Sequence, residues 1–289
     1  MTARRRLPRP WLRFAPVTEV RDARADEARA IADLLSRAGF GPTVGALIAF
    51  PRESPAGDVL VAERGGRAVG GVCCVAFGPT GWIGALGVVP DARRRGVGET
   101  LAHAACARLR ERGARTVLLF ATDMGRPLYD RLGFRSEGGA TAWRGRSGAA
   151  RSADVLLRGA RDEDRAAMLA IDRRVTGEDR SPVIDALVPL TGVVAERDGE
   201  PAGWAVQSPW GAGVAIAALD EAAGVVLTAA ATAGPGTSTI VVPDGNPAAS
   251  DALDGWGFSP SPAGERMRLG PAVGWRPELQ YGLFNLFWG

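Results

Sequence analysis

The 289-residue chain carries one pattern twice, and this internal duplication constrains its fold more than any other feature. Each copy begins with an Arg-containing strand before a helix. It continues with a strand, a glycine-containing hairpin turn and a second strand, and it has a Gly-Phe pair further on. The matching segments are Val20–Arg24 and Leu157–Arg161, Val61–Gly70 and Val194–Gly203, and Leu132–Phe134 and Trp256–Phe258. Three matches in the same order, at nearly constant spacing, predict two copies of one domain.

A short stretch of small and polar residues, 147–153, has the composition of a linker between the copies. We therefore expect one domain at 15–146 and a second at 154–289, preceded by a basic arm at 1–14. The hydrophobic content of 46% is that of a globular protein. No apolar run approaches the ~20 residues that span a bilayer, and the start has no apolar signal segment. We expect a cytoplasmic protein, and the Arg-, Ala- and Gly-rich usage is typical of a high-GC bacterial gene.

Hydrophobic periodicity gives a coarse order of elements for the first copy. A long amphipathic helix carries Val97, Leu101, Ala105 and Leu109 on one stripe, spaced by four residues as core packing requires. The expected order is strand 15–21, helix 25–38, short helix 43–49, strands 58–64, 67–77 and 82–89, helix 97–112, strand 116–122, helix 127–132 and closing strands 134–146.

A basic, glycine-bearing turn, Arg93-Arg94-Arg95-Gly96-Val97-Gly98, joins the strand 82–89 to the helix 97–112. Backbone N–H groups at a helix N-terminus, the helix dipole and side-chain cations together favour a pyrophosphate. Gly96 and Gly98 let phosphates approach the backbone, because neither carries a Cβ. A solvated turn is the plain alternative, but the flanking strand and helix favour phosphate contact.

A second motif, Arg126–Phe134, follows the next apolar strand. The two motifs, in this order, resemble the GNAT (GCN5-related) N-acetyltransferase family, whose loop reads Arg/Gln-x-x-Gly-x-Gly/Ala. The resemblance covers roughly residues 16–146. It implies an α/β fold with an α+β mixed sheet: tandem GNAT-like domains, each a mixed, mostly antiparallel sheet flanked by helices with a splayed parallel strand pair.

The resemblance also implies acetyl-CoA as the cofactor and assigns residues to it. The backbone of Leu86, Gly87 and Val88 would pair with the pantetheine arm and polarise the thioester carbonyl. The diphosphate would lie on the loop, with a hydroxyl hydrogen bond one turn into the helix. The residues implied for the diphosphate are Arg93, Arg94, Arg95, Gly96, Val97, Gly98 and Thr100.

Tyr129, on the short helix after the second splayed strand, is by resemblance the general acid that protonates the departing thiolate. A packing tyrosine with a satisfied hydroxyl is the alternative. The general base is not identified by any motif. Asp123 is the carboxylate nearest the expected cleft, Glu53 is a second candidate, and the carboxylate of Gly289 is a third.

The second copy has lost these features. Where its phosphate loop should fall, Ala217–Gly224 contains no Arg and two carboxylates, which would repel a pyrophosphate. This half resembles the C-terminal domain of some two-domain GNAT proteins, which implies a degenerate domain that completes the substrate pocket or packs against the first. The residues that carry this resemblance are Asp172–Arg180, Val242–Asn246, Glu265–Met267 and Tyr281–Phe284.

The sequence thus predicts an acetyl-CoA-dependent N-acetyltransferase that acts on a primary amine of a small molecule or peptide by direct attack. The alternatives are a non-catalytic acetyl-CoA-binding or scaffolding module, and acyl transfer to the amine of a thiol conjugate, as in the two-domain GNAT enzyme mycothiol synthase. We expect no metal site, because the chain has three cysteines and one histidine, and no membrane partner. The protein would be a monomer or homodimer. Nucleic-acid binding by the Arg-rich arm is a further alternative, against a solvated terminus.

Overall fold

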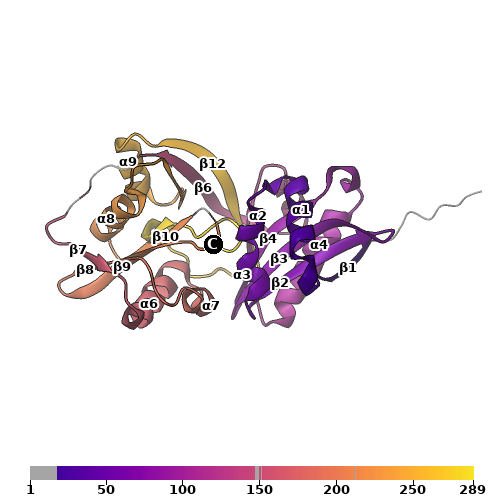
Figure 1. Ribbon diagram of the computed structural model, residues 1–289, viewed down its shortest axis with the longest axis horizontal. Coiled ribbons are helices and arrows are strands. Elements are labelled where there is room, and N and C mark those ends of the chain that lie inside the picture. The colour runs from indigo at the N-terminus through magenta and orange to yellow at the C-terminus, as the bar shows by residue number, and fades with distance from the viewer. Residues whose placement is uncertain (1–17, 147–149, 151, 212) are drawn as a thin grey trace, which may run out of the picture.

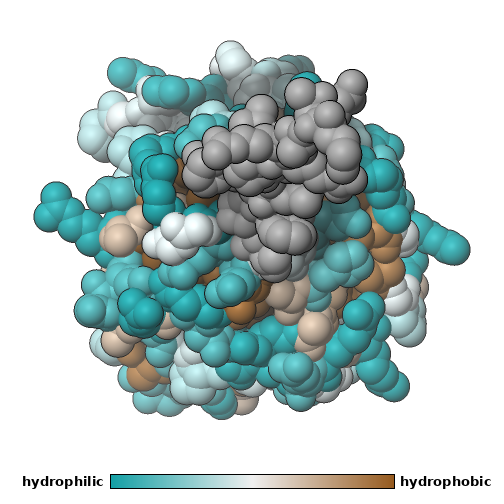
Figure 2. Space-filling view, turned by 90° about the vertical axis from the view of Figure 1, so that its right-hand side faces the viewer, coloured by the Kyte–Doolittle hydropathy of each residue, from teal (hydrophilic) through white to brown (hydrophobic). Residues whose placement is uncertain are grey.

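The computed structural model describes residues 18–146, 150, 152–211 and 213–289. It has two lobes side by side, with the C-terminus between them (Figure 1). The basic arm and most of the 147–153 segment lie outside the described residues. Among those described, no helix has the length and apolar character needed to cross a membrane. The end of the molecule formed by the first lobe is mainly hydrophilic where it is visible, with small scattered apolar areas (Figure 2).

The first half contains the expected order of strands and helices, with an additional helix, α3, and a π-helical turn, η2, after the first helix. One strand, β6, stands where closing strands were expected at 134–146. The elements are β1 (Thr18–Asp22), η1 (Ala25–Glu27), α1 (Ala28–Leu35), η2 (Ser36–Phe40), α2 (Val44–Leu47), α3 (Ala49–Glu53), β2 (Gly57–Arg64), β3 (Arg67–Phe77), β4 (Thr80–Val88), η3 (Pro90–Ala92), α4 (Val97–Glu111), β5 (Thr116–Ala121), α5 (Arg126–Arg131) and β6 (Arg135–Gly145).

The second half repeats this order and ends in an extra short strand, β13. Its elements are β7 (Leu156–Gly159), η4 (Asp162–Asp164), α6 (Arg165–Thr176), α7 (Ser181–Asp185), β8 (Val193–Arg197), β9 (Glu200–Gln207), β10 (Val214–Ala218), α8 (Glu221–Thr232), β11 (Ser238–Pro243), α9 (Pro247–Gly255), β12 (Ser259–Leu269), η5 (Pro277–Leu279) and β13 (Gln280–Gly282).

One polar contact recurs at the same place in both copies. Arg21 on β1 donates to Glu27 at 2.7 Å and to Glu63 on β2 at 2.8 Å. Arg158 on β7 donates in the same way to Asp164 and to Glu196 on β8, both at 2.6 Å. In each copy an arginine of the first strand therefore joins the start of the first helix to the second strand, which supports the duplication seen in the sequence.

The strands form two sheets, ordered β1-β2-β3-β4-β5-β12-β6-β11 and β13-β10-β9-β8-β7. All neighbours are antiparallel except β4 and β5, whose pairing is parallel. The large sheet is mixed and mostly antiparallel, as predicted, whereas the smaller sheet is antiparallel throughout, because β13 pairs with β10.

The final strands of the two copies are exchanged. β12, from the second copy, pairs with β5 of the first, and β6, from the first copy, pairs with β11 of the second. The exchanged strands β6 and β12 also pair with each other and arch together between the lobes (Figure 1). The large sheet therefore crosses the linker region, so the boundary at 147–153 divides the sequence repeat but does not divide the sheet.

A hydrophobic cluster joins the halves. It contains Trp82 and Leu118 of the first sheet with Ile184, Trp204 and Trp288 of the second half, all buried. An apolar contact of this kind resembles a domain core rather than a transient interface.

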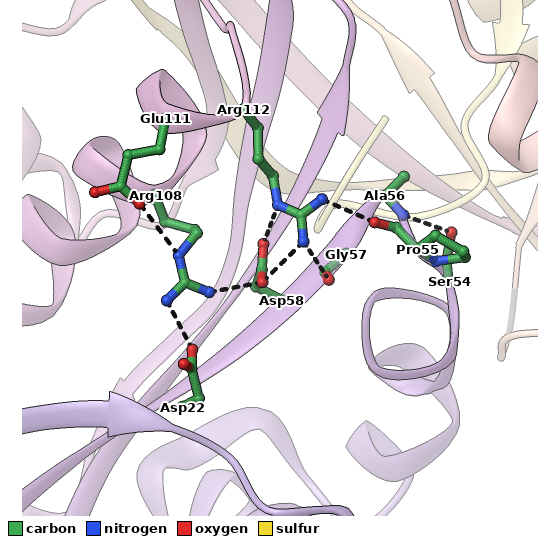
Figure 3. A network of polar contacts seen from close by, with 9 residues as sticks. All are labelled: Asp22, Ser54, Pro55, Ala56, Gly57, Asp58, Arg108, Glu111 and Arg112. Carbon is green, nitrogen blue, oxygen red and sulfur yellow. Dashed lines mark hydrogen bonds and ion pairs between the residues drawn. The ribbon is translucent and has the colours of Figure 1, made fainter.

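Helix α4 is tied to the paired strands β1 and β2 by arginines spaced four residues apart on one helix face. Arg108 contacts Asp58 at 2.7 Å and Asp22 at 2.8 Å, and Arg112 contacts Asp58 at 2.5 Å (Figure 3). These contacts fix the C-terminal half of α4, and so they help to position its N-terminus, where the predicted phosphate loop lies.

Candidate functional site

A gap between β4 and β5 creates the site. The two strands pair only over Thr80–Trp82 and Thr116–Leu118. Beyond this point β4 keeps β3 as its neighbour, but its other edge separates from β5. Ala85 has φ 49°, at an irregularity in the β3–β4 pairing. The splayed parallel pair predicted from the sequence is therefore present in the first copy, with a backbone edge free beside it.

The gap continues into a cleft of about 560 Å³, a size in the usual range for ligand pockets. The predicted strand residues and most of the predicted loop residues share its lining. They are Leu86, Gly87, Val88, Arg93, Arg94, Gly96, Val97 and Gly98. The lining also includes Phe40 of η2 and residues of the segment that follows β5.

The N-terminus of α4 opens onto this cleft without a side-chain cap. Its N-cap residue, Gly96, has φ 79°, and Arg94 has φ 57°, so the turn places both in the left-handed region. The first N–H groups of a helix have no partner within the helix. An uncapped N-terminus that lines a cleft with Arg94 is chemically suited to an anion.

Arg93 lines the cleft but is not a free cation. Its Nε donates to the carbonyl oxygen of Val88 at 2.9 Å and its Nη2 to that of Ala38 at 2.8 Å. Arg93 thus ties the loop to β4 and to η2, and holds two walls of the cleft together. The sequence could not indicate these carbonyl partners, because Ala38 is 55 positions away along the chain.

Two of the residues predicted for the diphosphate do not line the cleft. Arg95 is exposed. The hydroxyl of Thr100 donates to the carbonyl of Gly96 at 3.1 Å, which is a local helix contact. Both predictions assumed that every residue of the loop and first turn faces the ligand, whereas the turn directs successive side chains to different sides.

Tyr129 lies behind the cleft wall. It is 7% exposed and packs edge to face on Phe134, with ring centroids 5.5 Å apart. A Cβ on Gly125, which lines the cleft, would be 3.5 Å from the Tyr129 ring. Burial raises the pKa of Tyr129 well above its usual value. Its hydroxyl makes no hydrogen bond to another described residue. The alternative predicted from the sequence, a packing tyrosine with a satisfied hydroxyl, therefore holds for the ring but not for the hydroxyl.

Asp123 is exposed and lines a neighbouring pocket of about 400 Å³ rather than the cleft. This pocket also contains Asp244 and Glu265, and Thr122 lines both hollows. Thr141 donates to Asp244 at 2.7 Å, and Arg126 pairs with Glu265. The strand exchange brings these acids of the second copy beside Asp123, so a sequence search for an acidic cluster within one copy misses them.

The two other candidate bases lie elsewhere. Glu53 lines a separate pocket of about 730 Å³ with Phe50 and Trp210. The C-terminal residue Gly289 is buried, and Arg180 donates to its carbonyl oxygen at 2.8 Å. Neither residue lines the cleft in which the uncapped helix lies.

In the second copy, protein groups fill the corresponding places. Asp220 caps α8 by accepting from the N–H of Ala223 at 3.0 Å, so a carboxylate sits where α4 is open. β13 pairs with β10, and the N–H of Leu283 donates to Val241 of β11 at 3.0 Å. A strand of the chain's own C-terminus thus lies between β10 and β11. Tyr281 packs so closely on α8 that a Cβ on Gly224 would be 2.2 Å from its ring.

Comparisons with known proteins agree with this geometry. The sequence model of the acetyltransferase (GNAT) family matches residues 28–134. A "putative acetyltransferase" of Pyrococcus horikoshii is 21% identical, with a TM-score of 0.78 over 98% of this chain and 99% of that one. No curated protein is significantly similar in sequence.

Two further solved structures share the fold at lower similarity. A tandem GNAT protein from the clavulanic acid biosynthesis pathway is 16% identical, with a TM-score of 0.56 over 89% of this chain and 100% of that one. A GCN5-related N-acetyltransferase from Anabaena variabilis is 13% identical, with a TM-score of 0.58 over 87% and 72% of the two chains. At these identities the likeness concerns the fold.

Proposed function

We propose that the protein is an acetyl-CoA-dependent N-acetyltransferase that acts on a primary amine, since residues 28–134 match the sequence model of the acetyltransferase (GNAT) family. The observation that carries this proposal is the cleft, since every residue that lines it lies within the matched segment 28–134. Its uncapped helix N-terminus suits a diphosphate, and the free edge of β4 suits an extended amide-containing arm.

Different residues of the first copy bind the cofactor and transfer protons. The α4 N-terminus with Arg94 binds the diphosphate, and the β4 edge at Leu86–Val88 binds the pantetheine amides and polarises the thioester carbonyl. The cofactor supplies an activated acetyl group. Tyr129 would supply the proton that the leaving thiolate needs when the amine takes up the acetyl group. The amine loses a proton to Asp123, through water.

Direct attack of the amine on the thioester agrees with the burial of Cys106, which makes this thiol a poor nucleophile. Cys106 is buried on α4, and burial raises the pKa of its thiol. A thiol with a raised pKa is a poor nucleophile at neutral pH. An acyl-enzyme on Cys106 therefore has no support in this structure.

Calorimetric titration of acetyl-CoA tests the cleft directly. We expect one site per chain in the wild type, and binding weakened at least about tenfold in Gly98→Trp, whose indole would fill the cleft. Gly98→Ala is the matched control, because its Cβ would meet Leu128 at an ordinary 3.6 Å. Two sites would contradict a filled second copy, and an absence of binding would contradict the proposed function.

Asp123→Asn should lower kcat/KM for the amine about tenfold or more, because a general base contributes roughly 10²–10⁴-fold when proton removal limits the rate. Thiol release at saturating acetyl-CoA would measure it. Asp33→Asn, an exposed acid on α1, is the control and should leave the rate unchanged. An unchanged rate in Asp123→Asn would assign proton removal to water or to another carboxylate.

A further inference from the structure

The C-terminal tail of the second copy reaches the strand that would carry the thioester. After β13, the tail, residues 283–289, runs from the second lobe to the first: Leu283 still bonds to β11, whereas Phe287 lies on β4. A Cβ on Gly84 would be 2.4 Å from the carbonyl oxygen of Phe287 and 2.5 Å from its Cβ. The tail therefore lies directly against β4 where this strand has no side chain, one residue before the irregularity at Ala85.

Phe287 stands behind one wall of the cleft. Its ring meets that of Phe40 edge to face, with centroids 5.4 Å apart at 88°. Phe40 lines the cleft and presses on β4, since a Cβ on Gly87 would be 2.9 Å from Cε2 of Phe40. Phe287 and Phe40 together thus close the α1 side of β4 at Gly84–Gly87, the segment expected to hold the thioester.

The tail is held on both sides of Phe287, so this wall has little freedom to yield. The Asn285 side-chain oxygen accepts the N–H of Phe287 at 2.8 Å and that of Trp288 at 3.2 Å. Trp288 is fully buried and packs on Phe50, with centroids 5.0 Å apart. Arg180 then binds the last residue. Packed aromatic walls of this kind resist added volume.

We propose that Phe287 is a specificity-determining residue, which acts through Phe40 to limit the acyl group to acetyl. This inference rests on the proposed function, because it assumes that an acyl thioester occupies the β4 edge. Each further methylene of the acyl chain would press on the Phe40–Phe287 wall. One methylene in a hydrophobic pocket typically changes kcat/KM by about 10–200-fold.

The test compares acetyl-, propionyl- and butyryl-CoA as acyl donors in kcat/KM, and CoA itself in calorimetry. The wild type should prefer acetyl- over butyryl-CoA by at least about tenfold, and Phe287→Ala should reduce this preference to about threefold or less. Phe287→Leu keeps more of the packing and should admit propionyl- before butyryl-CoA. Leu286→Ala, which shortens the neighbouring half-buried side chain, is the control and should keep the wild-type preference.

The chain-length ratio separates a specificity role from a merely structural one, because a loosened fold would lower all three rates together. A wild type that binds acyl-CoA without discriminating chain length would overturn the inference. So would an unchanged ratio in both Phe287 variants with CoA affinity retained. A wild type that binds no acyl-CoA would contradict the proposed function itself.

Discussion

Replacing Tyr129 with Phe is expected to lower kcat for acetyl transfer by about 10²–10³-fold while leaving the fold intact, because a positioned general acid contributes roughly 10²–10⁴-fold. The ring fills the space between Gly125 and Phe134, and phenylalanine fills it equally. The hydroxyl bonds to no other described residue, so its removal breaks no hydrogen bond among them. Steady-state thiol release, together with a thermal melt of both proteins, measures the effect.

The other tyrosine of the chain supplies a matched control. Tyr281 is also buried, but it lies in the filled gap of the second copy. Tyr281→Phe should therefore leave kcat near the wild-type value. Burial raises the pKa of Tyr129, so this acid stays protonated past its ordinary value of about 10. An equal loss in both variants would contradict the assigned role, whereas an alkaline loss of rate below that value that disappears in Tyr129→Phe would contradict the raised pKa.

Arg180→Met is expected to lower the free energy of unfolding by about 3–5 kcal/mol, which is the usual cost of removing one partner of a buried ion pair. Arg180 is 3% exposed and binds both oxygens of Asp172, itself 1% exposed, at 2.6 and 3.0 Å. Its third donor binds Gly289. The substitution leaves a buried carboxylate without its cation and releases the end of the tail. Denaturant unfolding measures the loss.

A surface ion pair serves as the control for this experiment, and a double variant tests the role of the buried pair. Arg165 pairs with Asp185 at 2.5 Å, but both side chains are half exposed, so Arg165→Met should cost about 1 kcal/mol or less. Asp172→Leu combined with Arg180→Met should recover part of the loss, since the buried Asp172 carboxylate is then no longer left without its cation. If Arg180→Met costs no more than Arg165→Met, the expected cost of leaving the buried Asp172 without its cation is contradicted.

The parts of the site that the sequence predicted are those built from neighbouring residues. The helix expected at 97–112 is α4 at Val97–Glu111, and the loop before it lines the cleft with Gly96 and Gly98. A glycine-bearing turn between a strand and an amphipathic helix is a local pattern, so its geometry follows from nearby residues. The splaying of β4 from β5 was implied by the family resemblance rather than by a local pattern.

The parts that the sequence did not predict depend on contacts between distant segments. The sequence predicted that Arg93 would bind the diphosphate. In the fold, its guanidinium donates to the carbonyl oxygens of Val88 and Ala38. Asp244 and Glu265 lie near Asp123 because strands have changed places between the copies. Phe287 reaches β4 from the end of the chain. No periodicity or spacing within a segment carries information about such pairings.

The exchange of β6 and β12 also has a consequence for how the chain is made. β5 ends at residue 121, but its neighbour β12 begins only at residue 259. During synthesis at about 5–20 residues per second, that edge of β5 waits on the order of ten seconds for its partner. An unpaired strand edge invites pairing with other chains. The first half therefore completes its sheet only when the second half is nearly finished, and the two copies must mature as a single folding unit.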